Sequence, residues 1–144
     1  MMIGRDATID DAKAVLANLS EITRADIEAH DMSDADIMDT VQDYFNTGTA
    51  HVLLEDGNPL VVVGIAWMGD YWNCWLVAAE GFWSVRPSIW RMLRLYSQTV
   101  LAAMNEDFHS FSASPHPALS RWMAALGFKE VEQDGKFRHF IYSR

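Results

Sequence analysis

The sequence predicts a mixed α/β domain, with helices on both faces of a mostly antiparallel central sheet. Three apolar runs in the middle of the chain, separated only by the turns "DGNP" and "GD", are typical of a meander of antiparallel strands. Amphipathic helical patterns precede and follow this meander, so helices are available to cover both faces. The chain has 144 residues and neither a linker nor an internal repeat, which predicts a single domain over 1–144.

A short strand over 1–6 and two helices, over 8–30 and 33–48, are predicted for the first third of the chain. In the first helix the apolar residues recur at a spacing of three and four, as they do on the inner face of an amphipathic helix. The second helix opens with Ser33 and Asp36, whose spacing is that of a capping box.

The C-terminal part continues as helix, strand, helix and hairpin. Pro87 suits the first turn of a long helix, and Gly127 suits the end of a short one. The buried stripe of the long helix is predicted to hold Trp90, Leu93, Val100, Leu101 and Met104. The predicted elements after the first two helices are strands over 50–55, 60–68 and 71–78, the helix from 87, a strand over 107–114, a helix over 116–127, and hairpin strands over 128–133 and 136–143. The full order is β-α-α-β-β-β-α-β-α-β-β.

The net charge of −9 is concentrated in the first part of the chain. Residues 1–56 hold 3 Lys and Arg against 13 Asp and Glu, whereas residues 57–144 hold 8 against 7. Because an acidic protein repels a phosphate backbone, nucleic-acid binding is excluded as the main activity. A solvated helical face explains the acidity, and a docking surface for a basic partner is the alternative.

Cysteine content, apolar runs and histidine spacing restrict the compartment and the chemistry. A single cysteine, Cys74, excludes an intramolecular disulfide and favours a reducing cytoplasm, and its strand setting predicts a buried structural thiol. The N-terminus lacks the pattern of a signal peptide, and no apolar stretch is long enough to span a membrane. No spacing among the five histidines is that of a metal site, so no metal is expected.

The element order resembles that of the GNAT (Gcn5-related N-acetyltransferase) fold. The opening "IGRDATIDDAKAVLANL" is similar to the first strand and helix of that fold, and "ALGFKEVEQDGKFRHFIYS" is similar to its last helix and closing hairpin. The resemblance covers nearly the whole chain. It implies an acyl-CoA N-acyltransferase fold, with acetyl-CoA as the cofactor if the protein is active and a small amine as the acceptor.

A closer resemblance, over roughly residues 60–142, is to internal virion protein A, a GNAT-like family of short-tailed phages. Three features carry it: Trp75 and Trp83 eight residues apart; Arg121-Trp122-Met123 followed by Leu126-Gly127; and Asp134-Gly135 followed by Phe137 and Phe140. This resemblance implies a phage-encoded protein of the host cytoplasm or the virion, with a role in particle assembly or host interference. A virion or host protein would be its partner, and a homo-oligomer is a further expectation.

The segment "AEGFWSVRP", from Ala79 to Pro87, decides between an active and a degenerate cofactor site. In acetylating GNAT proteins the equivalent loop reads Arg/Gln-x-x-Gly-x-Gly/Ala, and its glycines let backbone N–H groups approach the pyrophosphate. Here the bulky Phe82, Trp83 and Val85 stand in place of those glycines. The sequence therefore predicts a degenerate acetyl-CoA loop.

The remaining cofactor and catalytic candidates follow from the same resemblance. Arg86 and Arg91, at the start of the helix after this loop, are candidates for binding a phosphate by their side chains, although surface positions with stems packed on Trp rings also explain them. Glu80 aligns with a common loop glutamate and is the candidate base. Backbone groups of Cys74, Leu76 and Val77, and the side chain of His116, are the other cofactor-binding candidates.

The usual tyrosine acid of the fold has no counterpart, because Met123 stands there and methionine cannot donate a proton. Three function hypotheses therefore remain open: a GNAT-like phage protein with a degenerate site, a working acetyltransferase for a lysine, N-terminus or polyamine, and a non-catalytic interaction module. In the third, an aromatic patch of Trp83, Trp90 and Trp122 contacts the partner.

Overall fold

The computed structural model describes residues 1–82, 86–112, 118–131, 135 and 137–143. Within these residues seven strands form one sheet in the order β1-β2-β3-β4-β5-β7-β6. Neighbouring strands are antiparallel except β4 and β5, which run parallel. The strands are β1 (Met2–Asp6), β2 (Gly48–Glu55), β3 (Asn58–Trp67), β4 (Trp72–Ala78), β5 (Phe108–Ser112), β6 (Lys129–Glu130) and β7 (Arg138–Tyr142).

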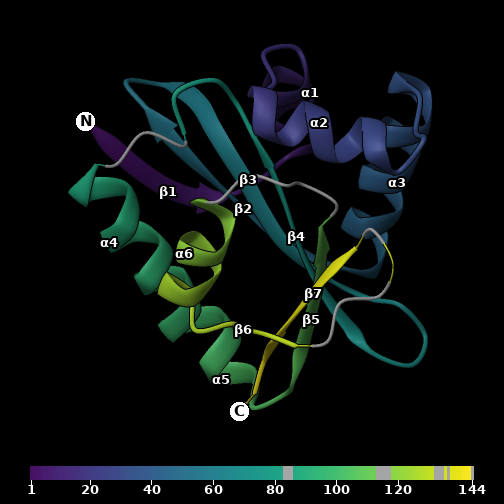
Figure 1. Cartoon of the computed structure of the whole chain (residues 1–144). Helices are drawn as coiled ribbons and strands as arrows, with labels where there is room; N and C mark the ends of the chain where they lie inside the picture. Colours follow the sequence, from purple (N-terminus) through teal and green to yellow (C-terminus); the bar gives the residue numbers. More distant parts are fainter. Residues whose placement is uncertain (83–85, 113–117, 132–134, 136, 144) are drawn as a thin grey trace.

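Helices cover both faces of this sheet, as the sequence predicts (Figure 1). One face packs on α1 and α3 through a core that includes Val15, Val41 and Val62, and the other packs on α4 and α6 through a core that includes Ile65, Leu93 and Phe140. The helices are α1 (Ile9–Leu16), α2 (Glu21–Ala29), α3 (Asp34–Thr47), α4 (Pro87–Tyr96), the π-helical turn η1 (Ser97–Leu101), α5 (Ala102–Met104) and α6 (Ala118–Ala125).

The first predicted helix, over 8–30, is wrong as one element, because the chain leaves the helix after Leu16 and starts α2 at Glu21. The intervening residues bond to the end of β4: Leu19 forms a β-bridge with Ala79, and the Ser20 N–H donates to the Ala78 carbonyl at 2.9 Å. These bonds to a distant strand replace the helical bonds that the periodicity predicts.

The predicted capping box of the second helix is confirmed at α3. The Ser33 hydroxyl accepts from the Asp36 N–H at 3.2 Å, and the Asp36 carboxylate accepts from the Ser33 N–H at 3.0 Å. The buried stripe of the helix from Pro87 is also confirmed, since Leu93 and Leu101 are buried. Trp90, Val100 and Met104 pack against the same core.

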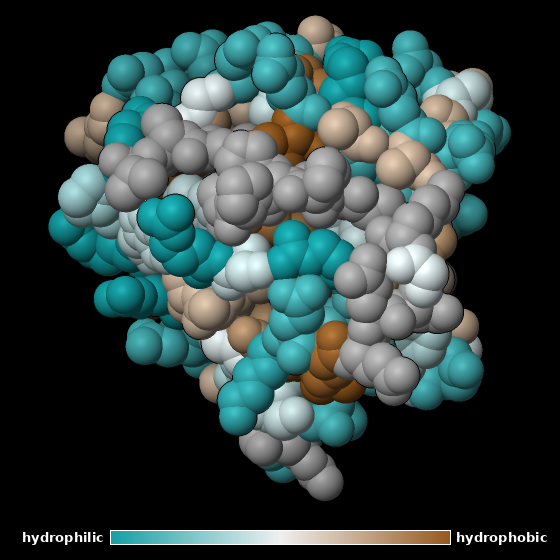
Figure 2. Space-filling view, viewed as in Figure 1, coloured by the Kyte–Doolittle hydropathy of each residue, from teal (hydrophilic) through white to brown (hydrophobic). Residues whose placement is uncertain are grey.

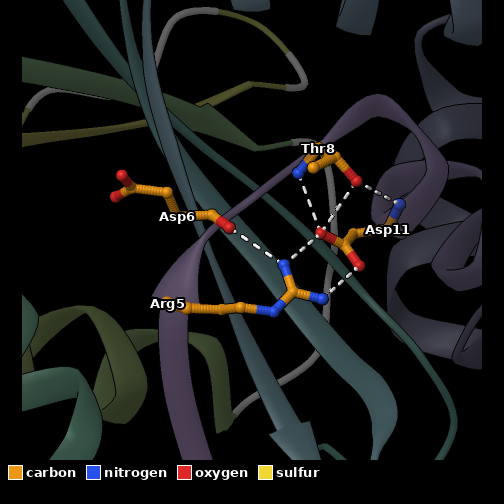
Figure 3. Close-up of polar contacts among 4 residues, drawn as sticks. All are labelled: Arg5, Asp6, Thr8 and Asp11. Atoms are coloured by element: carbon orange, nitrogen blue, oxygen red, sulfur yellow. Dashed lines mark hydrogen bonds and ion pairs between the residues drawn. The ribbon is translucent and has the colours of Figure 1, made fainter.

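A buried carboxylate joins β1 to the start of α1 (Figure 3). Asp11 is 7% exposed, and its two oxygens accept from the Arg5 guanidinium at 2.7 and 3.0 Å. It also accepts from the N–H of Thr8 at 2.8 Å, which completes a capping box with the Thr8 hydroxyl. The Arg5 hydrogen bonds, followed by those from Thr8, hold the pKa of Asp11 below its ordinary value despite burial.

Asp11→Asn is expected to lower the free energy of unfolding at pH 7 by about 1–3 kcal/mol, because it weakens a charge-assisted pair and a helix cap. Since the pKa of Asp11 is depressed in the folded state, its contribution is present above about pH 4 and is lost as the pH falls through the folded value. Urea denaturation from pH 7 down to pH 3 measures both effects. Asp10→Asn, an exposed position in the same helical turn, is the control. If the free energy of unfolding of Asp11→Asn fell between pH 7 and pH 3 by as much as that of the parent, this account would be contradicted.

Candidate functional site

The parallel strands β4 and β5 pair only at their first residues and then separate. The paired residues are Trp72 with Phe108 and Asn73 with His109, and neither strand has a further partner in the other. Beyond Asn73, β4 continues to Ala78 on its own side of this opening. The two central strands therefore form a V that opens toward their C-terminal ends.

The start of α2 forms hydrogen bonds with the backbone of β4 at the open end of the V. The Ala78 N–H donates to the Thr23 hydroxyl at 3.3 Å, and the Ala78 carbonyl accepts from the Ser20 N–H at 2.9 Å. Ser20 is also the N-cap of α2, because its hydroxyl accepts from the Thr23 N–H. A helix start thus occupies the place where a continued parallel strand would bond.

The backbone of Leu76 faces into the V. Ala79 donates to Leu60 of β3, so the antiparallel register directs Ala79 and Val77 toward β3 and directs Ala78 and Leu76 away from it. Leu76 lies three residues beyond the last β4–β5 pair. Its N–H and carbonyl are therefore directed into the opening, whereas those of Val77 belong to the β3 ladder.

A cavity of about 310 Å³ lies at the V and is lined from both faces of the sheet. On one side the lining comes from α2, α3 and the residues between them; on the other it comes from Phe82, α4 and α6. Figure 2 shows mostly hydrophilic surface at the top of this view, with small hydrophobic areas visible in the upper and lower centre. Most of the lining residues are apolar or aromatic, as they are in small-molecule sites.

On the α6 side the cavity is lined by Phe82 and Trp122, and Trp90 stacks on Trp122. The Trp122 ring lies between Trp90, at 4.2 Å and 8° from parallel, and Phe82, at 5.1 Å between centroids. Trp122 is only 3% exposed, so its ring packs in the core and is not presented on the surface. Trp90 is half-buried. Trp83, the other member of the predicted patch, lies outside the described residues.

The described residues do not place the predicted base, or free anion-binding N–H groups of the predicted loop, at the cavity. Glu80 is exposed and is not among the described residues that line the cavity, and its N–H donates to the Asn18 carbonyl at 3.0 Å. The N–H of Ala79 and that of Phe82 also have backbone acceptors. Residues 83–85 and the candidate His116 lie outside the part of the chain that the structure describes.

The two candidate arginines differ in their surroundings. Arg86 is the N-cap residue of α4 and forms an ion pair with Glu55 of β2, while its Nε is buried without a hydrogen-bond partner among the described residues. Arg91 is exposed one turn into α4, with no ion pair to a described residue. Arg86 therefore has a structural partner that its position in the sequence does not indicate.

Polar side chains that the sequence analysis missed lie on the α2–α3 side of the cavity. They are Asp26 and His30 of the α2 segment, Tyr44 of α3, and Tyr71 before β4. Burial, together with the nearby Tyr71, raises the pKa of Tyr44, so this phenol stays protonated at neutral pH. The only sequence signal for the first pair is an aspartate four residues before a histidine at a helix end.

Comparison with known proteins gives structural neighbours only. No protein-family model matches, and no curated protein matches by sequence. The GNAT domain of an S. lividans PAT superposes with a TM-score of 0.72 at 11% identity, over 98% of this chain and 89% of that one. PaiA N-acetyltransferase from Thermoplasma acidophilum, solved in complex with coenzyme A, gives 0.69 at 11%, over 100% and 99%. An acetyltransferase from Streptococcus agalactiae gives 0.70 at 15%, over 99% and 98%.

The chain has the GNAT fold. The sequence prediction of that fold is thereby confirmed, and the V between β4 and β5 is its central feature here. In this GNAT fold none of the described helices is long and apolar enough to cross a membrane. No cluster of three or more potential metal ligands occurs among the described side chains.

Cys74 of β4 is among the residues that line the cavity, and its thiol is buried in a setting that disfavours the reactive thiolate. The residue is 6% exposed, and burial raises the pKa of the thiol to about 12. This agrees with the prediction of a buried structural thiol.

Native protein at pH 8 is expected to react with a thiol reagent about 10³-fold more slowly than an unperturbed cysteine, since a pKa of about 12 leaves that much less thiolate. Labelling with Ellman's reagent, before and after addition of guanidinium, measures the difference, and Cys74→Ser gives the background. Rapid native labelling would show that the thiol is accessible.

Thr23→Val is expected to cost about 1–3 kcal/mol of stability, because the buried Ala78 N–H then loses its acceptor without a change in side-chain shape. Chemical denaturation measures the loss. Thr49→Val, at an exposed strand position, is the matched control and should stay within about 0.5 kcal/mol of the parent. Equal stability of the two variants would mean that the contact between α2 and β4 is not what holds the strand end.

Proposed function

We propose that this chain is an acetyl-CoA-dependent N-acetyltransferase that binds the cofactor in the V between β4 and β5. The observation that carries the proposal is the backbone of Leu76, directed into a 310 Å³ cavity past the last β4–β5 pair. An extended amide-bearing chain satisfies such a strand edge with its own donor and acceptor. The pantetheine arm of acetyl-CoA has that chemistry.

The residues present fit the pantetheine part of the cofactor. Leu76 offers one donor and one acceptor, and the apolar walls from Leu93, Leu119 and Trp122 suit the arm's carbon chain. Arg91 lies one turn into α4, where phosphate groups would be held, whereas Arg86 is paired with Glu55 and its Nε is buried. When bound, acetyl-CoA supplies an activated acetyl thioester.

The acceptor would approach from the α2–α3 side of the V, opposite α4 and α6. That side carries the acidic first part of the chain, which attracts a cationic amine such as a lysine, an N-terminus or a polyamine. The base predicted at Glu80 is not among the described cavity residues, so another group must accept the amine proton.

A second candidate function is a non-catalytic role in a phage particle or against a host protein, with a virion or host protein as the partner. It is favoured by the resemblance to internal virion protein A and by two features of the site. Met123, rather than a proton donor, lines the cavity beside Trp122, and Arg86 is already paired with Glu55. In that case the V between β4 and β5 would be a feature of the fold without a catalytic role.

Thermal unfolding with acetyl-CoA separates the two functions. A ligand at about 100 times its Kd adds about 2.7 kcal/mol to stability, which raises the Tm of a chain this size by roughly 5–10 °C. Ser110→Leu, which fills the cavity from β5, should abolish the increase. Thr49→Leu, on an exposed strand position, should retain it.

Absence of any Tm increase at millimolar acetyl-CoA would overturn the acetyltransferase proposal and leave the non-catalytic role. An increase that survives in Ser110→Leu would place the cofactor outside the V. Dephospho-CoA and free pantetheine, tested in the same way, report how much of the binding comes from the phosphates.

A further inference from the structure

We propose that His30 is the general base of this site and that the acceptor is a primary amine on an apolar, ring-sized body. The inference rests on the proposed function, because it assigns a catalytic role and an acceptor class to the α2–α3 side of the same cavity. Its observations are the orientation of the His30 ring, the position of the ring on the cavity lining, and the composition of the α2–α3 wall.

His30 is held in one orientation at the end of α2. It is the C-cap residue, and the next residue, Asp31, has a left-handed φ of 56° that turns the chain. The His30 Nδ1 lies 2.7 Å from the Asp26 carbonyl oxygen and 3.6 Å from a carboxylate oxygen of the same residue. The ring contacts that of Phe137, with 4.7 Å between centroids and 53° between the ring planes.

These contacts fix the tautomer of the neutral ring. A carbonyl oxygen accepts only, so the short contact requires the proton on Nδ1 and leaves the lone pair on Nε2. Nε2 has no hydrogen-bond partner among the described residues, and the side chain is about 30% exposed at the cavity rim. The Nε2 lone pair of a neutral imidazole is the proton acceptor that a general base requires.

The transfer step balances with this assignment. Nε2 of His30 takes one proton from the incoming ammonium, which gives the neutral amine. The amine nitrogen then forms the C–N bond with the thioester carbonyl carbon as the C–S bond breaks. The second nitrogen proton goes to the departing sulfur, and the proton on His30 passes to solvent through the open rim.

The α2–α3 wall favours an apolar body on the amine. Its lining is largely aliphatic and aromatic, and Tyr71, on the same side, meets Phe111 of β5 edge to face with 6.2 Å between the ring centroids. A polyamine would bring a second ammonium to this wall, where Asp26 is the one carboxylate among the described lining residues and already lies 3.6 Å from His30, so the second charge would be poorly paired and costly to bury. The described lining residues of this wall are Ile22, Thr23, Asp26, Ile27, His30, Met32, Ile37, Thr40, Val41 and Tyr44.

The base assignment is tested with His30→Gln and His30→Ala in a thiol-release assay with acetyl-CoA and 2-phenylethylamine. Each variant should lower kcat about 10²-fold or more, with KM for the amine changed less than about threefold. Added imidazole should restore part of the His30→Ala rate. His51→Gln is the control, because His51 lies on β2 and lines a different cavity.

The outcomes separate this inference from the proposed function. If acetyl-CoA raises the Tm of both His30 variants as it does that of the parent, but their kcat is unchanged, the base assignment alone is wrong. If the parent binds acetyl-CoA and the amine without turnover, the base assignment also fails. If the parent does not bind acetyl-CoA, both proposals fall.

The acceptor class is tested by calorimetry on the complex with coenzyme A, using 2-phenylethylamine, spermidine and a lysine-containing peptide as probes. Tighter binding of 2-phenylethylamine, by about tenfold or more, is expected. Preference for spermidine or for the peptide would overturn the apolar acceptor class. The assignment of His30 as the base would then be decided by the thiol-release assay alone.

Discussion

The structure depends on where the hydrogen bonds at the end of β4 go. Ala78 directs its N–H and carbonyl away from β3, and both are satisfied by the start of α2 through Thr23 and Ser20. Because buried backbone groups must be paired, this helix start removes the need for β5 to continue alongside. The V stays open, and the β3–β4 ladder on its other side remains continuous.

The two sides of the V have different chemistry, and this division organises the site. Toward α4 and α6 the walls are apolar, closed by the stack of Phe82, Trp122 and Trp90. Toward α2 and α3 the wall adds a histidine, a carboxylate and two phenols to an aliphatic lining. A thioester held along Leu76 would place its carbonyl between the two sides of the cavity. The apolar α4–α6 side would bind the pantetheine arm, and the more polar α2–α3 side would accept and donate protons.

Local sequence patterns predicted the elements well wherever the bonds that form them are local. The capping box of Ser33 and the buried stripe after Pro87 both follow from short-range spacing. The break of the first helix did not, because Ser20 bonds to a residue 58 positions later in the chain.

The site was less predictable than the fold for the same reason. Arg86 was assigned to a phosphate, but its ion-pair partner, Glu55, is 31 positions earlier. No sequence motif marks His30, because only the packing of α2 against the V places this residue on the cavity.

The anchoring of α2 also has an evolutionary consequence. Because Leu19 and Ser20 pair with Ala79 and Ala78, an insertion or deletion within 17–20 would break the bonds that hold α2 at the end of β4. The length of this connector is therefore under selection together with the width of the V, while exposed turns elsewhere in the chain can change length freely.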